Sequence, residues 1–285
     1  MTLPTVLPVP TLDHVVINCR DRLDEGLDVY RRLGFQMTPR GHHSLGSMNH
    51  LAIFGTDYLE LIAVPDGDSP RQDVMRYPFG LNGLVFGTED SAATYAQAKQ
   101  AGVLVEPPME FSRPVTLVEG EPPARDAVFR TIHLSPGTVT AGRFYFCHHF
   151  TRDLVWRDAW RTHPNGAIGI ASATIAATDP GALAAIFARL FGPDAIRPIE
   201  GGHRLAVGLT SFDFVTPAEV ESRFGDAAPD AQGRDQYMAA LTIRTRSLSA
   251  AEKSLQSGNI HAKRQSSRLI VPAPQAMGAT LVFQE

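Results

Sequence analysis

Hydrophobic and polar positions along the chain repeat one arrangement four times. A short apolar run of the kind found in strands ends in a polar turn, and a helical segment of about three turns follows. A glycine or asparagine closes each helical segment, and short alternating segments come after it. The pattern therefore predicts a unit with the order β-α-β-β-β, present in four copies.

Turn and cap residues place the four copies along the sequence. Asp179 and Ser249 are the predicted N-caps of the third and fourth helices, and Gly192 and Gly258 are expected to end them. The first strands of the units are expected at 14–18, 84–86, 173–176 and 241–244, and the first two helices at 23–33 and 91–101. Each helix carries apolar residues three or four positions apart, which favours packing of the helix on a sheet.

Four units predict two paired domains, at residues 1–160 and 161–285, and an α+β fold class. The long segments 65–79 and 106–126 carry prolines and charges. We interpret them as loops or irregular insertions over the sheet.

Composition narrows the classes of partner and compartment. Hydrophobic residues make up 44% of the chain, the formal net charge is -4 and no long basic run occurs, which disfavours nucleic acid or an anionic membrane as a partner. Cys19 and Cys147 lie in apolar strand-like contexts and are expected to be buried free thiols. We find no signal peptide and no membrane-spanning run, so a cytoplasmic location is expected.

Two ionisable residues stand inside apolar strand-like segments. His14 lies in LDHVVIN and Glu60 in DYLELI. An ionisable group in such a place is costly unless it is paired or bound to a metal ion. Two other interpretations remain open, namely a buried histidine bonded to a neighbour and a carboxylate at an exposed strand edge, although the apolar flanks of Glu60 argue against the latter.

Several local sequences, taken in order, resemble the vicinal oxygen chelate superfamily and within it the glyoxalase-like group. They are LDHVV at 12–16, GSMNH at 46–50, YLELI at 58–62, FCHHFT at 146–151 and WRTHPNGA at 160–167. The resemblance extends over about the first 180 residues, and beyond them it rests on the repeat. It implies four β-α-β-β-β modules that form two paired glyoxalase-like domains with curved mixed sheets.

The resemblance also implies a divalent metal ion in a cavity between two modules, with ligands from their first and last strands. His14, Glu60 and His149 would then form a site with open positions for Fe, Zn, Mn or Ni, with His148 an equal alternative to His149. The first-strand positions of the other three units hold Gly83, Ser172 and Ala240, so a ligand set is expected only in the N-terminal pair.

Lactoylglutathione lyase activity is not implied, because glyoxalase I has a second histidine where this chain has Gly83. The last-strand positions of the third and fourth units are Phe212 or Asp213, and Val282 or Gln284.

Polar residues near the second and third strands are candidates for substrate binding. Arg40 could hold a carboxylate by two hydrogen bonds, and Asn49 could orient a carbonyl group. His43 is a third candidate, although its glycine-containing context is also typical of a solvated turn.

These features predict a metal-dependent lyase, isomerase or dioxygenase that acts on a small oxygen-rich metabolite by chelating two vicinal oxygens. Glu60 is the candidate for moving the proton. The alternative is a protein of the bleomycin-resistance type, which sequesters a small molecule without catalysis. The C-terminal pair could have a structural or dimerising role, which makes a homodimer possible.

Overall fold

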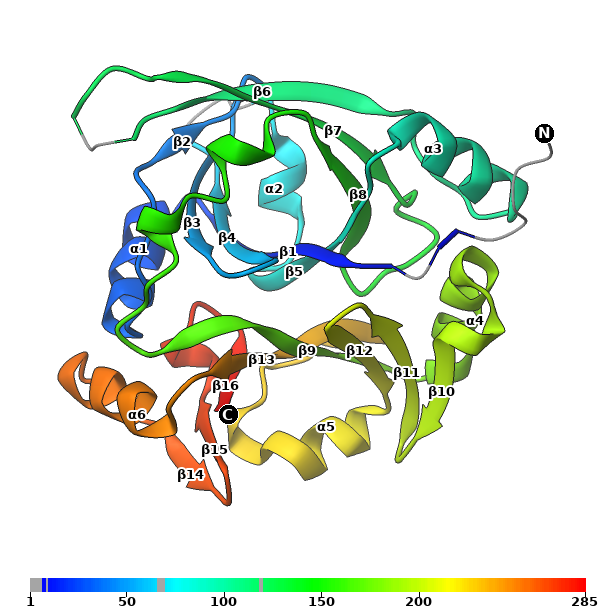
Figure 1. Cartoon of the computed structure of the whole chain (residues 1–285). Helices are drawn as coiled ribbons and strands as arrows, with labels where there is room; N and C mark the ends of the chain where they lie inside the picture. The colour runs from blue at the N-terminus through cyan, green and yellow to red at the C-terminus, as the bar shows by residue number, and fades with distance from the viewer. Residues whose placement is uncertain (1–6, 9, 66–69, 118–119) are drawn as a thin grey trace.

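The computed structural model describes residues 7–8, 10–65, 70–117 and 120–285. It contains two mixed sheets of eight strands, one built from each half of the chain (Figure 1). Each sheet consists of two consecutive β-α-β-β-β modules, so the α+β fold of four such modules is confirmed.

The elements of the first half are β1 (Leu12–Arg20), α1 (Leu23–Arg32), β2 (Gly41–His42), β3 (Met48–Ile53), β4 (Tyr58–Ala63), α2 (Gln72–Arg76), β5 (Gly80–Gly87), α3 (Ser91–Gln100), β6 (Met109–Val115), β7 (Arg125–His133) and β8 (Arg143–His149). The strand order is β2-β3-β4-β1-β5-β8-β7-β6. The first strands of the two modules, β1 and β5, pair antiparallel at the centre of the sheet.

The elements of the second half are β9 (Ala167–Ala177), α4 (Pro180–Phe191), β10 (Ile196–Ile199), β11 (Gly202–Val207), β12 (Thr210–Val215), α5 (Pro217–Phe224), β13 (Gln236–Thr245), α6 (Leu248–Ser257), β14 (Lys263–Gln265), β15 (Arg268–Val271) and β16 (Thr280–Gln284). The strand order, β10-β11-β12-β9-β13-β16-β15-β14, repeats that of the first sheet.

The two sheets share one hydrophobic core, which lies between them (Figure 1). Val15 and Ile17 of β1 belong to it together with Ile175 of β9 and Leu241 of β13. Because successive side chains of a strand face opposite ways, the intervening Val16 points to the other face of the first sheet. That face lines a cavity, so the alternation of β1 separates the shared core from the candidate site.

The segment 106–126 differs from the sequence interpretation. It was expected to be a loop, but Met109–Val115 forms β6, the last strand of the first sheet. Pro114 is tolerated there because an edge strand does not need every backbone N–H for pairing. Within 65–79 the short helix α2 is present, whereas 66–69 lie outside the described residues.

Caps explain where the helices begin. Asp90 and Asp179 accept hydrogen bonds from backbone N–H groups in the first turns of α3 and α4, as N-caps do. The cap of α6 is Ser247, not the predicted Ser249, so this helix begins earlier than expected. Cys19 and Cys147 are free and buried.

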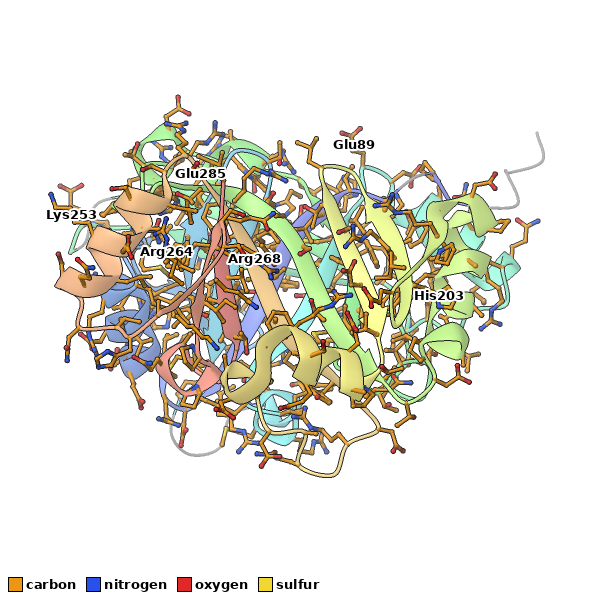
Figure 2. All side chains as sticks on the ribbon, turned by 90° about the horizontal axis from the view of Figure 1, so that it is seen from below. Glu89, His203, Lys253, Arg264, Arg268 and Glu285 are labelled. Atoms are coloured by element: carbon orange, nitrogen blue, oxygen red, sulfur yellow. The ribbon has the colours of Figure 1, made fainter. Side chains whose placement is uncertain are left out.

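The outer surface is polar. Charged side chains such as Lys253, Arg264 and Glu285 lie on the outside of the C-terminal half (Figure 2). No helix among the described residues is long and apolar enough to cross a membrane.

Candidate metal and substrate site

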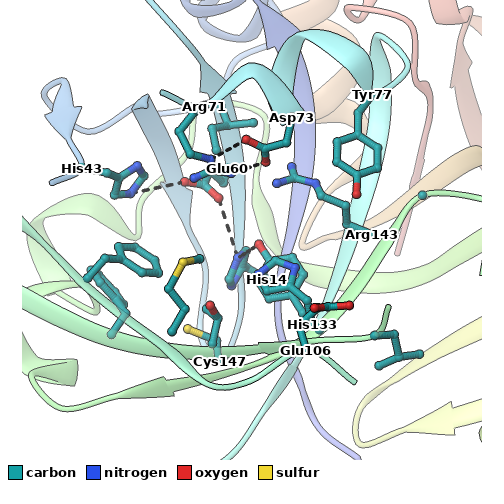
Figure 3. A pocket seen from close by; sticks show the side chains of 18 of the residues that line it. His14, His43, Glu60, Arg71, Asp73, Tyr77, Glu106, His133, Arg143 and Cys147 are labelled. Carbon is teal, nitrogen blue, oxygen red and sulfur yellow. Dashed lines mark hydrogen bonds and ion pairs between the residues drawn. The ribbon is translucent and has the colours of Figure 1, made fainter. Parts of the chain in front are cut away.

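A cavity of about 840 Å³ opens on the face of the first sheet that is turned away from the shared core. Side chains of β1, β3, β4, β6, β7 and β8 line it, together with residues of α2 and of the loops that flank it (Figure 3). Both modules of the N-terminal half therefore contribute to its wall, and β1 and β4 bring His14 and Glu60 into it.

An approximate twofold relation between the modules shows which residues correspond. In the antiparallel pair of β1 and β5, His14 lies opposite Val85 and Val16 lies opposite Gly83. The approximate twofold axis interchanges β1 and β5, and it therefore interchanges these two residue pairs. Under this relation His14 corresponds to Gly83, and Val16 corresponds to Val85. Each first strand also pairs in parallel with the last strand of its own module.

The parallel pairs identify the last-strand positions. Glu60 lies opposite Val16, and Tyr145 lies opposite Val85. Tyr145 therefore corresponds to Glu60, in place of the predicted His149 or His148. In the second half the same position belongs to Asp213, opposite Thr174, and to Val282, opposite Thr242.

His14 is held between a buried carboxylate and the cavity. Its Nδ1 lies 2.6 Å from Asp13 Oδ1, and its Nε2 lies 3.0 Å from the Tyr145 hydroxyl and 3.7 Å from Glu60 Oε2. Burial would raise the pKa of Asp13, but His149 and His14 hold it below its ordinary value. Because this carboxylate accepts the Nδ1 proton, the neutral ring presents the lone pair of Nε2 to the cavity.

Glu60 is buried at the wall of the same cavity, with 6% of its surface exposed. The Asn49 amide donates a hydrogen bond of 2.7 Å to Oε1. Burial would raise the pKa of Glu60, but its electrostatic interactions with His14 and His43 and the Asn49 hydrogen bond bring it below its ordinary value. Glu60 is therefore a carboxylate at neutral pH.

Tyr145 is a site residue that the sequence interpretation missed. Its hydroxyl donates to the lone pair of His14 Nε2, and its ring stacks on His133 with centroids 4.3 Å apart. Burial raises the pKa of Tyr145 well above its ordinary value and lowers that of His133 to about 3. At neutral pH the hydroxyl thus keeps its proton and His133 is uncharged. Only the register of β8 against β5 reveals this position.

His149 lies on the other side of the His14 ring. Its Nε2 is 3.0 Å from Asp13 Oδ1, and it is not among the residues that line the cavity. Among the described residues, Asp13, His14 and His149 form the one group of three or more His, Cys, Asp or Glu side chains with the spacing of a metal site. Glu60 faces His14 Nε2, whereas His149 contacts Asp13, which is bonded to His14 Nδ1. The structure therefore does not gather the predicted three ligands around one point.

The predicted substrate residues lie in different places. Asn49 and His43 line the cavity, and the His43 ring is buried there with Nδ1 2.9 Å from the Ser47 hydroxyl. Burial lowers the pKa of His43 to about 4, so the ring is neutral at pH 7. Arg40 is outside the cavity and pairs with Asp24 on the surface.

The donor set of the cavity can be compared with what a divalent ion needs. His14 Nε2 lies 3.0 Å from the Tyr145 oxygen and 3.7 Å from Glu60 Oε2, about the spacing of ligand atoms around an ion bonded at about 2.1 Å. Gly83 supplies no donor, and a Cβ there would lie 2.8 Å from Val16. The residues therefore fit an ion held by His14 and Glu60, with the neutral Tyr145 beside it and several positions left for substrate.

Comparison with protein families places these observations in context. Residues 12–191 match the glyoxalase-like domain family. The match covers the whole first sheet and continues through α4. Among curated protein sequences, none matches this chain.

Among the solved structures that are similar in fold, three show the range of the likeness. A hypothetical protein from Staphylococcus aureus is 13% identical, with a TM-score of 0.67 over 97% of this chain and 99% of that one. A triple mutant of 4-hydroxymandelate synthase from Streptomyces coelicolor is 12% identical, with a TM-score of 0.57 over 98% and 94%. A fusion of a xylose isomerase-like TIM barrel with 4-hydroxyphenylpyruvate dioxygenase is 12% identical, with a TM-score of 0.57 over 100% of this chain and 50% of that one. At these identities the likeness shows a common fold.

Proposed function

Since this chain belongs to the glyoxalase-like domain family of the vicinal oxygen chelate superfamily, we propose that it is a divalent-metal-dependent enzyme acting on a small oxygen-rich metabolite. The observation that carries the proposal is the approach of His14 Nε2 and Glu60 Oε2 in a cavity wall, with Asp13 bonded behind the imidazole. A carboxylate behind a histidine is the usual support of a metal ligand.

The roles of the side chains follow from their contacts. A bound ion would act as a Lewis acid on two neighbouring oxygens of the substrate. Asp13 fixes the tautomer and the direction of the His14 ring, and Asn49 fixes Glu60 through Oε1. The Oδ1 atom of Asn49 is buried without a hydrogen-bond partner among the described residues, so the side chain is held by its amide nitrogen, which bonds Glu60.

Proton movement would involve Glu60 and Tyr145. Glu60 is ionised and can take a proton from the bound substrate, and in an isomerisation it returns that proton to a different atom. Tyr145 keeps its proton, so its hydroxyl can donate a hydrogen bond to a substrate oxygen on which negative charge develops. Isomerase, lyase and dioxygenase reactions of small oxygen-rich substrates can all begin with this arrangement.

The test is the metal content of the purified protein. We expect close to one equivalent of Fe, Zn, Mn or Ni by elemental analysis, and a loss of metal affinity of at least about 100-fold in both His14→Ala and Glu60→Gln. His261→Ala is the matched control, because His261 is exposed on the C-terminal half. Full metal binding by the first two variants would contradict the proposal.

A sequestering function without metal is the second candidate, and one contact favours it. The Tyr145 hydroxyl already satisfies His14 Nε2, and Gly83 adds no ligand. If the protein stripped of metal binds its small molecule as tightly as the untreated protein and shows no turnover, this candidate replaces the enzyme.

A further inference from the structure

We propose that the substrate carries a large, uncharged apolar body beside its oxygen-rich end, and that Phe111 and Phe129 hold this body. The observation is an apolar strip of the cavity wall that begins next to Glu60 and continues to the mouth of the cavity. The inference rests on the proposed function for the oxygen-rich end of the substrate, and it names the class of the remainder.

The inner end of the strip lies close to the candidate metal site. Phe111 of β6 and Phe129 of β7 are opposite each other in the strand pairing, and their rings stack with centroids 5.3 Å apart. The Phe111 ring meets the His43 ring edge to face at 5.4 Å, and His43 Nε2 lies 3.9 Å from Glu60 Oε1. One side chain therefore separates the aromatic pair from the carboxylate of the candidate site.

The outer end of the strip lies on the same face of β6. Met109 is two residues before Phe111, so both side chains point to the cavity, and both line it. Met109 is 40% exposed, whereas Phe129 is 5% exposed. Pro107 and Pro136 also line the cavity and are exposed. The exposure of these lining residues locates the mouth, so the strip connects the buried end of the cavity with solvent.

The size of the cavity decides how much of the strip a ligand can cover. Its volume of about 840 Å³ lies in the upper part of the range of about 300–1,000 Å³ that is typical of pockets for drug-sized ligands. A substrate of only a few atoms at the candidate metal site would leave the aromatic pair in contact with water. Hydrocarbon placed against this surface removes that contact, which is favourable by about 25 cal/mol for each Å².

The charged side chains of the wall interact with one another. Asp73 is bound by Arg71 through two hydrogen bonds of 2.8 Å, as Figure 3 shows. Arg113, the next residue on the inner face of β6 after Phe111, interacts electrostatically with Glu60. A second charge on the ligand would have to compete with these interactions and lose its own hydration. The body of the substrate is therefore inferred to be uncharged.

The experiment uses vicinal diols that differ only in the length of their apolar chain. Propane-, butane-, hexane- and octane-1,2-diol are titrated calorimetrically into protein stripped of metal and into protein loaded with metal. We expect affinity to rise by about two- to fourfold for each added methylene, because each one moves from water to the strip. This increase should be the same with and without metal, because the strip contains no metal ligand.

Substitutions in the strip test whether it is the binding surface. Phe111→Ala and Phe129→Ala should each lower the affinity for octane-1,2-diol by about tenfold and leave that for propane-1,2-diol unchanged. Phe111→Leu keeps an apolar side chain and should retain most of the affinity. Leu209→Ala is the control, because Leu209 is 72% exposed and lies outside the cavity.

The possible outcomes separate this inference from the proposed function. Affinity that does not depend on chain length, a dependence that survives both alanine substitutions, or no binding of octane-1,2-diol would overturn the apolar body. A dependence on chain length in a protein that binds no divalent metal would support the apolar body and refute the metal-dependent function alone. Metal binding without any dependence on chain length would have the reverse meaning.

Discussion

The two halves of the molecule place a carboxylate at the same position of the same fold, but they surround it with different partners. Glu60 in the first half meets His14, Asn49 and an open cavity. Asp213 in the second half is bound by Arg204 through two hydrogen bonds of 2.5 and 2.7 Å and by Arg223 at 3.0 Å. The first carboxylate can meet a ligand, whereas the charge of the second is already neutralised.

The two sheets also differ in what covers the face that is turned away from the shared core. In the second half α5 lies across the open side of the sheet, and its Val220 packs with Ala176, Val215 and Tyr237 (Figure 1). In the first half the short α2 and the segment that carries Trp156 and Trp160 lie on that side, and a cavity remains. A longer helix and two arginines thus leave an ion cluster in the second half where the first half has a cavity, with the strand order unchanged.

The largest expected effect concerns the closed carboxylate. Asp213→Asn leaves Arg204 without its counter-charge and Arg223 with Glu219 alone, so we expect the free energy of unfolding to fall by about 2–3 kcal/mol. Urea denaturation measures it. Ligand and metal affinity of the first half should stay as in the unmodified protein, and a loss of either would show that the halves are not functionally separate.

A substitution at Gly83 tests why the first strand of the second module, β5, carries no ligand at the position that corresponds to His14. A Cβ at this position would lie 2.8 Å from Val16 Cβ and Cγ2, so we expect Gly83→Ala to cost about 2 kcal/mol. Combining it with Val16→Ala should recover at least about 1 kcal/mol in a double-mutant cycle, because the crowded methyl groups are then gone. Additive effects would mean that the contact does not limit this position.

Asp57 lies at the contact between the two halves, and its carboxyl should make the free energy of unfolding depend on pH. Burial raises the pKa of its carboxyl to about 7, against the usual value near 4, while its Oδ1 accepts a hydrogen bond from the Ile170 N–H. The folded protein therefore holds a proton that the unfolded chain has lost, and the stabilisation present below pH about 4 disappears as pH rises through about 7.

Asp57→Asn removes this titration and keeps an acceptor for Ile170. We expect it to raise the free energy of unfolding by about 1–2 kcal/mol at pH 8.5 and to leave it nearly unchanged at pH 4. Thermal melts across this range test it, and an equal effect at both pH values would exclude the carboxyl as the cause.

The smallest effect is expected at Arg40. Its pairing with Asp24 lies on the surface, so Arg40→Ala should change stability by less than about 0.5 kcal/mol and ligand affinity not at all. Calorimetric titration with octane-1,2-diol measures the second quantity. A clear loss of affinity would return Arg40 to the binding site that the sequence predicted for it.

Local patterns were sufficient for the architecture of this chain. Caps, helix-ending glycines and apolar alternation predicted four β-α-β-β-β modules, and they placed His14 and Glu60 on strands that do line one cavity. β6 was missed because Pro114 and its charged neighbours suggested a loop, although Met109, Phe111 and Arg113 alternate as strand residues do.

The rest of the site depends on long-range pairing. The register of β8 against β5 places Tyr145 in the site, and no local pattern within either strand specifies that register. His149 is two positions beyond Cys147 at the end of β8, and the structure brings it to Asp13. Short sequence motifs suggest which residues can do chemistry, but strand pairing decides which of them meet.

The core between the sheets has a consequence for how the molecule loses its structure. Val15 and Ile17 are covered by residues of the second half, such as Ile175 and Leu241. A chain cut after residue 160 would expose that surface to water, so neither half is expected to melt alone. The second half therefore covers the apolar face of the sheet whose other face lines the cavity, and heating should give a single calorimetric transition.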